Sequence, residues 1–161
     1  MLIVLSGLPG VGKTTIAREL ARAIGALHVR IDSIEQALRD SGREIEAEGY
    51  RVAYAVAEDN LRVGQVVIAD CVNPWPLTRE AWRSVAARAG AGVVDIEIVC
   101  SDVDEHRRRV ESRVSDIPQH RLPTWSEVVA RDYRPWNGER IVIDTADLDV
   151  EHSVQRILSA L

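Results

Sequence analysis

The sequence predicts a three-layer α/β domain, in which a five-stranded parallel sheet carries helices on both faces. Short runs of aliphatic and β-branched residues alternate with longer segments of helical period, which is typical of βα units that feed a parallel sheet. The chain has 161 residues, a length that fits one compact domain over residues 1–161. It contains no internal repeat and no low-complexity tract, so nothing points to a second unit.

This alternation places each element along the chain. We expect strands at residues 2–6, 27–31, 65–70, 93–100 and 140–144. We expect helices at residues 13–24, 32–41, 50–63, 77–90, 102–113, 124–133 and 149–160. Glycines stand where four of these helices should end, as a left-handed C-terminal position requires: Gly25, Gly42, Gly64 and Gly90.

Start signals support three of the helices, because an oxygen-bearing side chain precedes an acid by three residues. These pairs are Asp32 with Glu35, Ser101 with Asp104, and Thr124 with Glu127. The stretch at 114–123 contains two prolines and no sustained period. We interpret it as a mobile lid.

Composition and charge narrow the classes of function. The formal net charge of −5 argues against a long polyanion such as nucleic acid as a partner. No apolar run is long enough to span a bilayer, and the first strand leaves no room for a signal peptide, so a cytoplasmic location is expected. The two cysteines, Cys71 and Cys100, and the four histidines lack ligand spacing. We expect free thiols and assign the histidines no role.

Residues 7–14, GLPGVGKT, satisfy the pattern GxxxxGK[ST] between an expected strand and helix. The glycines let backbone N–H groups turn toward phosphates, and the following helix adds its positive end. Lys13, the only lysine among twenty basic residues, supplies a compact charge for the β and γ phosphates. The motif predicts a nucleoside triphosphate ligand, and a chance lysine in an ordinary turn is the alternative. The nucleotide-binding residues expected here are Gly7, Pro9, Gly10, Val11, Gly12, Lys13, Thr14 and Thr15.

Two acids end expected strands, where ligands gather on a doubly wound sheet. Asp70 ends the run QVVIAD, and Asp32 ends LHVRID. A solvated strand end is the alternative for Asp70. Asp32 has an alternative as a helix cap with no part in chemistry.

An arginine-rich segment, DEHRRRVESR, leads from an expected helix into the lid. Arg109 and Arg113 lie four residues apart and are expected to share one helix face. One would stack on the base and the other would close over the phosphates, which supplies in cis the charge of an arginine finger. A solvated surface cluster is the alternative.

These motifs resemble those of small P-loop kinases, in the AAA-type branch that includes chloramphenicol phosphotransferase, gluconate kinase, adenylylsulfate kinase and the kinase domain of polynucleotide kinase. The likeness covers nearly the whole chain and implies a P-loop NTPase fold with strand order 2-3-1-4-5. That order places Asp70 about 4.8 Å from the P-loop strand and Asp32 about 10 Å from it. The nearer acid, with the Thr14 hydroxyl, suits Mg²⁺, and the farther one suits an acceptor hydroxyl.

The resemblance also carries roles to individual residues. IDSIEQAL is similar to the acceptor-side segment of chloramphenicol phosphotransferase, which implies that Asp32 is the catalytic base. RVESR resembles the lid arginines of gluconate kinase, which implies adenine stacking by Arg109 and phosphate contact by Arg113. VIDTAD resembles the loop that borders adenine, so Thr145 and Ala146 are expected to line that pocket.

The part of the site that would bind the acceptor is supported by weaker sequence similarities. ADCVNPWPLTREAW is similar to the polynucleotide kinase segment after its third strand, and its Trp75 lies in a double-proline turn suited to an aromatic wall. Glu35 stands where polynucleotide kinase has an arginine, which argues against a nucleic-acid acceptor. The acceptor candidates are Asp32, Arg39, Tyr50, Asn73, Trp75 and Arg79.

Together these features predict an ATP-dependent kinase that moves the γ-phosphoryl group of MgATP to a hydroxyl of a small organic molecule. Lys13, Asp32 and Arg113 are the expected catalytic residues, and Thr14 and Asp70 the expected metal ligands. A polynucleotide 5′-hydroxyl kinase and an ATP-binding or ATP-hydrolysing regulatory switch are the alternatives. The sequence names neither the acceptor, the oligomeric state nor the preference for ATP over GTP.

Overall fold

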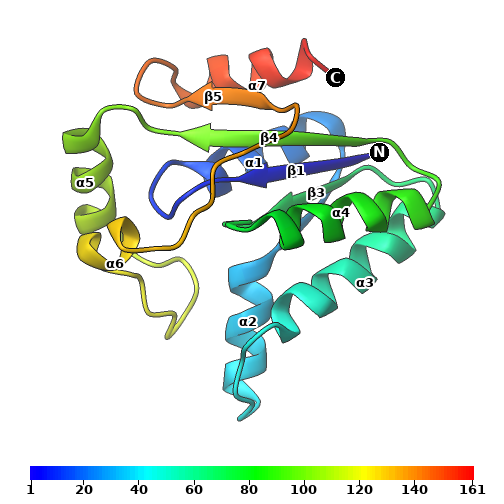
Figure 1. Cartoon of the computed structure of the whole chain (residues 1–161), viewed down its shortest axis with the longest axis horizontal. Coiled ribbons are helices and arrows are strands. Elements are labelled where there is room, and N and C mark those ends of the chain that lie inside the picture. Colours follow the sequence, from blue (N-terminus) through cyan, green and yellow to red (C-terminus); the bar gives the residue numbers. More distant parts are fainter.

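The computed structural model describes residues 1–161 and shows a five-stranded parallel sheet between layers of helices (Figure 1). The strands are β1 (Leu2–Ser6), β2 (Leu27–Arg30), β3 (Val67–Asp70), β4 (Val93–Val99) and β5 (Ile141–Asp144). Their order is β2-β3-β1-β4-β5, and every neighbouring pair is parallel. The predicted fold class and strand order are confirmed.

The helices also follow the predicted sequence of elements. They are α1 (Lys13–Ile24), α2 (Ile31–Asp40), α3 (Glu48–Arg62), α4 (Pro76–Arg88), α5 (Val103–Ser112), α6 (Trp125–Val129) and α7 (Val150–Leu158). Helix α6 is much shorter than the predicted span of 124–133. After it, the backbone N–H of Arg134 donates to the carbonyl of Pro74 at 2.8 Å, a tertiary contact that draws this stretch away from a helical path. None of the helices is long and apolar enough to cross a membrane.

Two hydrophobic cores cover the two faces of the sheet. Ile3 and Leu5 of β1 belong to the core beneath α1 and α7, and Leu2 and Val4 belong to the core beneath α3 and α4. Successive residues of a strand point to opposite faces, so one central strand supplies both cores. All five residues of β1 are buried, as expected for a parallel strand covered on both sides.

The structure confirms one of the three predicted helix starts, moves the second by one residue and contradicts the third. Thr124 and Glu127 form the predicted capping box of α6. Helix α5 is capped instead by Asp102, one residue after the predicted position, whose carboxylate accepts from the Glu105 N–H at 3.0 Å. Helix α2 begins at Ile31 with no side-chain cap, so the predicted box headed by Asp32 is wrong. The four glycines expected to end helices all have positive φ.

The strands β1 and β4 point toward the end of the molecule where α5 and α6 lie, and α2 leaves the sheet on a neighbouring side (Figure 1). Both chain termini lie at the opposite end. Ligands of such sheets gather outside the carboxyl ends of the strands. The fold therefore presents one end of the sheet, between α5, α6 and α2, as the place for a site.

Candidate active site

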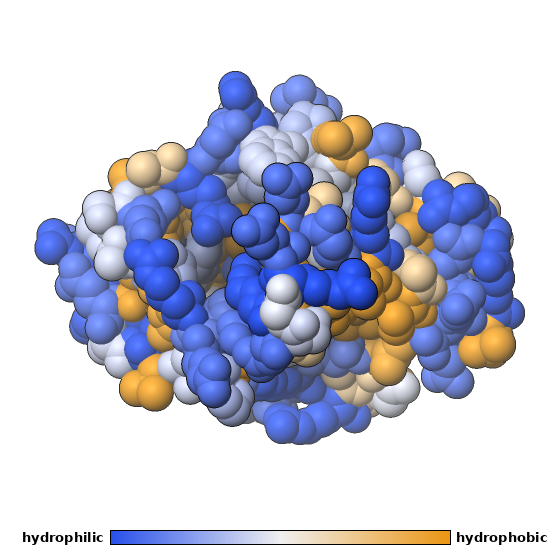
Figure 2. Space-filling model, turned by 90° about the horizontal axis from the view of Figure 1, so that it is seen from below, coloured by the Kyte–Doolittle hydropathy of each residue, from blue (hydrophilic) through white to orange (hydrophobic).

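A cleft of about 950 Å³ opens at the carboxyl ends of the strands, and most of the residues that line it are polar or charged. Hydrophilic residues also predominate over the face seen from below, with a hydrophobic area right of centre (Figure 2). The predicted site residues that line the cleft are Pro9, Gly10, Gly12, Lys13, Thr14, Thr15, Asp32, Arg39, Tyr50, Asp70, Trp75, Arg109 and Arg113. Those outside the lining are Gly7, Val11, Asn73, Arg79, Thr145 and Ala146.

The P-loop closes around the side chain of Lys13, the first residue of α1. Lys13 is 8% exposed, and its ammonium donates to the carbonyl of Leu8 at 2.9 Å. Burial lowers the pKa of Lys13, while the nearby carboxylates of Asp70 and Asp32 act to raise it. The first N–H groups of a helix have no intrahelical partner, and the first residues of α1, Lys13, Thr14 and Thr15, line the same cleft. The loop thus gathers a buried cation and free donors, which suits a phosphate chain.

Gly7 lies outside the cleft but holds the loop close to β4. Its φ is 142°, and an added Cβ would lie 2.2 Å from the backbone oxygen of Ile98. We expect Gly7→Ala to lower the free energy of unfolding by about 2 kcal/mol or more, because strain and steric overlap act together. Gly92→Ala is the matched control, since its Cβ would meet nothing within 4 Å. Urea unfolding of both variants tests this, and equal stabilities would contradict it.

Asp70 ends β3 beside Leu5 of the P-loop strand, and its side chain is 3% exposed. Burial by itself would raise the pKa of Asp70, but the hydrogen bond with His28, the Lys13 ammonium and the Thr14 hydroxyl together hold that pKa below its ordinary value. The carboxylate is therefore charged at neutral pH and faces both predicted P-loop partners.

The hydroxyl of Thr14 and the carboxylate of Asp70 are hard oxygen donors of the kind that Mg²⁺ prefers. The structure contains no group of three or more His, Cys, Asp or Glu side chains placed to hold a metal. Two protein oxygens fit a magnesium ion that arrives with nucleotide phosphates and keeps several waters.

Asp32 lies in the first turn of α2 and lines the cleft. Its side chain is 46% exposed, and the nearest basic atom is an Nη of Arg30 at 4.0 Å. Because it caps no helix, the interpretation of Asp32 as a helix cap is wrong. The structure leaves this carboxylate accessible to a ligand.

Arg113 is placed differently from the prediction. Helix α5 ends at Ser112, and Arg113 has an extended backbone with ψ 146°, so the shared helix face with Arg109 is wrong. Two nitrogens of its guanidinium, Nε and one Nη, are buried without a hydrogen-bond partner. Burial lowers the pKa of Arg113, and Asp32 acts in the opposite direction. Unsatisfied donors in a cleft fit an anionic ligand, because unpaired buried donors are costly.

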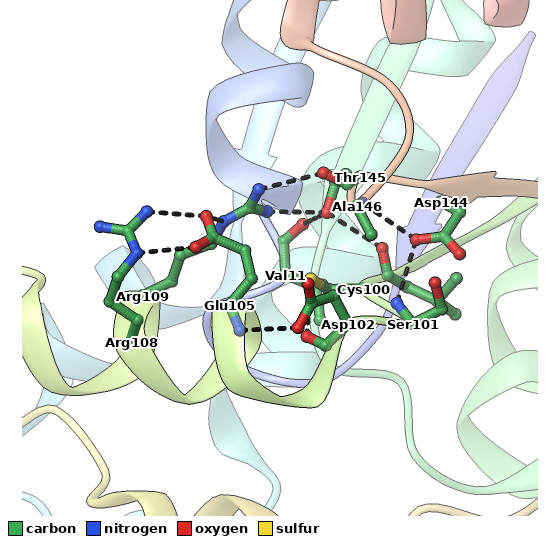
Figure 3. A network of polar contacts seen from close by, with 11 residues as sticks. Val11, Cys100, Ser101, Asp102, Glu105, Arg108, Arg109, Asp144, Thr145 and Ala146 are labelled. Atoms are coloured by element: carbon green, nitrogen blue, oxygen red, sulfur yellow. Dashed lines mark hydrogen bonds and ion pairs between the residues drawn. The ribbon is translucent and has the colours of Figure 1, made fainter.

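Arg109 joins α5 to the loop after β5 (Figure 3). Its guanidinium donates to the hydroxyl of Thr145 at 2.9 Å, to the Thr145 carbonyl at 3.0 Å and to Glu105 at 2.7 Å. Hydrogen bonds from Arg108 and Arg109 lower the pKa of Glu105 to about 2. The Thr145 hydroxyl also lies 3.0 Å from the carbonyl of Val11. Thr145 and Val11 therefore connect this network to the P-loop from outside the cleft.

Asn73 and Arg79 are part of the framework rather than the cleft wall. Asn73 is fully buried and donates from its side chain to Ser6 at 3.0 Å. Arg79 is 4% exposed, and its guanidinium lies 4.1 Å from the ring centroid of Trp136. It donates to the backbone oxygens of Asn73, Pro74, Arg134 and Pro135, at 3.2, 3.2, 2.6 and 3.0 Å. The sequence predicts that both side chains contact an acceptor, but the structure places them in the framework outside the cleft lining.

The turn that Arg79 holds carries Trp75 to the edge of the cleft. Trp75 is 46% exposed, and its indole N–H donates to Asp132 at 3.0 Å. Tyr50 lines the cleft nearby, and its hydroxyl accepts from the Asn73 N–H at 3.1 Å. Arg39 also lines the cleft and pairs with Glu35 at 3.0 Å.

Four contacts were not predicted from the sequence. A ring nitrogen of His106 lies 2.9 Å from the Pro9 carbonyl and supports the P-loop from α5. His28 contacts Asp70 at 3.2 Å. Arg30 donates to Asp116 at 2.9 Å, which ties the predicted lid to β2, and Arg18 of α1 pairs with the same acid. No local spacing signals these contacts, because each joins residues far apart in the chain.

The segment expected to form a lid, 114–123, contains neither helix nor strand. All of its residues except Ile117 and Pro118 line the cleft. The segment therefore covers one side of the site, where the ion pairs of Asp116 hold it.

Comparison with known proteins agrees with this geometry. Residues 2–131 match the protein family described as "AAA domain". The chain is 26% identical over 171 residues to the "Probable adenylyl-sulfate kinase" of Aeropyrum pernix, over 99% of this chain and 91% of that protein. Among solved structures, the APS kinase CysC of Mycobacterium tuberculosis in complex with AMPPNP and APS gives a TM-score of 0.73 at 18% identity, covering 98% of this chain and 95% of that chain. A gluconokinase from Sinorhizobium meliloti 1021 gives a TM-score of 0.65 at 16% identity, covering 98% and 89%. The chain belongs to the AAA domain family and has the fold of the small P-loop kinases.

Proposed function

We propose that the chain is a cytoplasmic ATP-dependent kinase that transfers the γ-phosphoryl group of MgATP to a hydroxyl of a small organic molecule. The observation that carries the proposal is that Lys13, Arg113 and Asp32 line one cleft above the buried Asp70. Two cations are available for phosphate charge, and one accessible carboxylate is available for a hydroxyl. The likeness to an adenylyl-sulfate kinase supports the same class of reaction.

Phosphoryl transfer passes through a loose transition state, so positioning and charge neutralisation supply most of the catalysis. Lys13 and Arg113 would neutralise charge on the phosphates. Thr14 and Asp70 would hold magnesium, which, when bound, neutralises oxygens of the β and γ phosphates. Asp32 would orient the acceptor hydroxyl and take its proton as the new bond from oxygen to the γ phosphorus forms. The bond from that phosphorus to the β–γ bridging oxygen breaks, and ADP leaves.

Arg109 is proposed to lie against the adenine, because this residue lines the cleft and its guanidinium is fixed by Thr145 and Glu105. We expect Arg109→Lys to weaken ATP binding about tenfold, since a lysine keeps the charge but loses the planar fork and stacking surface. Arg107→Lys, at an exposed arginine paired with Glu111, is the matched control. Titration of both variants with a fluorescent ATP analogue measures the effect. Equal affinities would remove Arg109 from the base site.

The test of the proposed function is incubation with MgATP or MgGTP and a panel of acceptors, followed by a mass search for a phosphorylated product. The panel contains adenylyl sulfate, gluconate and other sugar acids, antibiotics with free hydroxyls, nucleosides and oligonucleotides. A phosphorylated small molecule is the expected result. A phosphorylated oligonucleotide would favour the polynucleotide kinase alternative, and ADP release without any product would favour the switch.

A further inference from the structure

A histidine on the edge strand contacts the buried acid of the site. Nε2 of His28 lies 3.2 Å from Oδ2 of Asp70, across the neighbouring strands β2 and β3. The side chain of Asp70 is 3% exposed and that of His28 is 20% exposed. An ionised carboxylate can only accept hydrogen bonds, so Nε2 of His28 carries the proton in this contact.

The strand register explains why His28 fills this role. Arg30 is the β2 residue directly opposite Asp70, and His28 lies two residues earlier on the same face of the strand. Nε of Arg30 is 4.0 Å from Oδ2 of Asp70, which is beyond hydrogen-bond range. One Nη of Arg30 is engaged by Asp116 instead. From the β2 side, His28 is therefore the hydrogen-bond donor to this oxygen.

We infer that His28 is a positioning residue, which fixes the rotation of the Asp70 carboxylate so that its other oxygen is presented to the magnesium–nucleotide complex. The inference rests on the proposed function, in which Asp70 is a metal ligand. Residues that bind a metal-ligating side chain from behind orient it, and their loss typically weakens metal affinity. Lys13 and Thr14 act on the same carboxylate, so its orientation affects the phosphate side of the cleft directly.

The experiment compares three variants with the wild type. His28→Leu removes the donor, His28→Gln keeps an N–H donor at a similar reach, and His28→Asn carries a donor on a shorter side chain. Competition with a fluorescent ATP analogue gives the affinity for ATP in EDTA and in excess Mn²⁺, and electron paramagnetic resonance of free Mn²⁺ gives metal uptake independently. His152→Leu, at an exposed histidine of α7, is the matched control.

We expect His28→Leu and His28→Asn to weaken binding of Mn²⁺–ATP by about tenfold, the lower end of the effect of such supporting residues, with the affinity for metal-free ATP unchanged. His28→Gln should restore most of the Mn²⁺–ATP affinity. A general structural role for His28 would weaken both affinities equally and would overturn the inference, as would unchanged Mn²⁺–ATP affinity. Should His28→Leu fail to fold, the contrast between His28→Gln and His28→Asn decides in the same way.

Failure of this inference is distinguishable from failure of the proposed function. If the wild type binds Mn²⁺–ATP and phosphorylates an acceptor while all His28 variants match it, only the role of His28 is wrong. If the wild type shows no affinity for ATP with or without metal, the proposed kinase is wrong and the His28 inference falls with it.

Discussion

Replacing Lys13 with alanine is expected to reduce phosphoryl transfer by about three orders of magnitude or more, comparable to the loss of a preorganised charge in other sites. Lys13 is 8% exposed and lies under the P-loop, where solvent screens its charge poorly. No other lysine exists in the chain to replace it. Single-turnover transfer from radiolabelled ATP measures the loss at saturating nucleotide.

Lys13→Arg is expected to fail as well, because a planar guanidinium is larger than the ammonium that is buried here and donates to the Leu8 carbonyl. The matched control is Arg22→Ala in the last turn of the same helix, where the side chain is 69% exposed. That variant should keep the wild-type rate. Transfer by Lys13→Ala within about tenfold of the wild type would be inconsistent with phosphate neutralisation by this residue.

Replacing Asp32 with asparagine is expected to slow transfer by about two orders of magnitude while leaving ATP affinity unchanged, because general base catalysis contributes about that much. The amide keeps the size and hydrogen-bonding shape of the carboxylate but cannot take a proton. Asp32 is 46% exposed and caps no helix, so little change in stability is expected. Asp40→Asn, near the end of the same helix, is the control for an altered α2.

The kinetic pattern separates two roles for Asp32. A fall in kcat with an unchanged KM for the acceptor indicates proton transfer in the transition state, whereas a rise in KM alone indicates binding of the hydroxyl. Full activity of Asp32→Asn would show that neither role is needed. In that case, the group that binds the acceptor hydroxyl would be another residue of the cleft lining.

The architecture was predictable because it rests on local patterns. The apolar runs of the strands, the helical period between them and the GxxxxGK[ST] loop all lie within short stretches of sequence, and all appear in the structure. Asp32 and Asp70 end or follow strands whose carboxyl ends meet at one edge of the sheet. That geometry brings both residues to the lining of the cleft.

Apart from the helix caps, the predictions that failed concern contacts between residues far apart in the chain. Arg79 is expected from the sequence to contact the acceptor, yet it is buried by a loop more than fifty residues later in the chain. His28 and His106 have no spacing that marks them, because their partners come from other elements. Arg113 is expected from the sequence at the end of a helix over 102–113, on the same face as Arg109, and no residue type in this stretch indicates that α5 ends at Ser112. The positions of these side chains depend on tertiary packing rather than on local sequence propensity.

Arg79 braces the turn that carries Trp75 through contacts that limit which residues of this part of the cleft wall can vary in sequence. All four of its hydrogen-bond acceptors are backbone oxygens, which every amino acid supplies. The four hydrogen bonds of Arg79 therefore do not depend on the identity of the side chains at those positions, although the side chain of Asn73 is held separately by Ser6. Trp75 and Asp132, by contrast, meet through their side chains, so this contact depends on the identity of both residues. If Trp75 meets the acceptor as proposed, a change in acceptor preference at this wall is expected to alter Trp75 and Asp132 together while the backbone contacts of Arg79 stay the same.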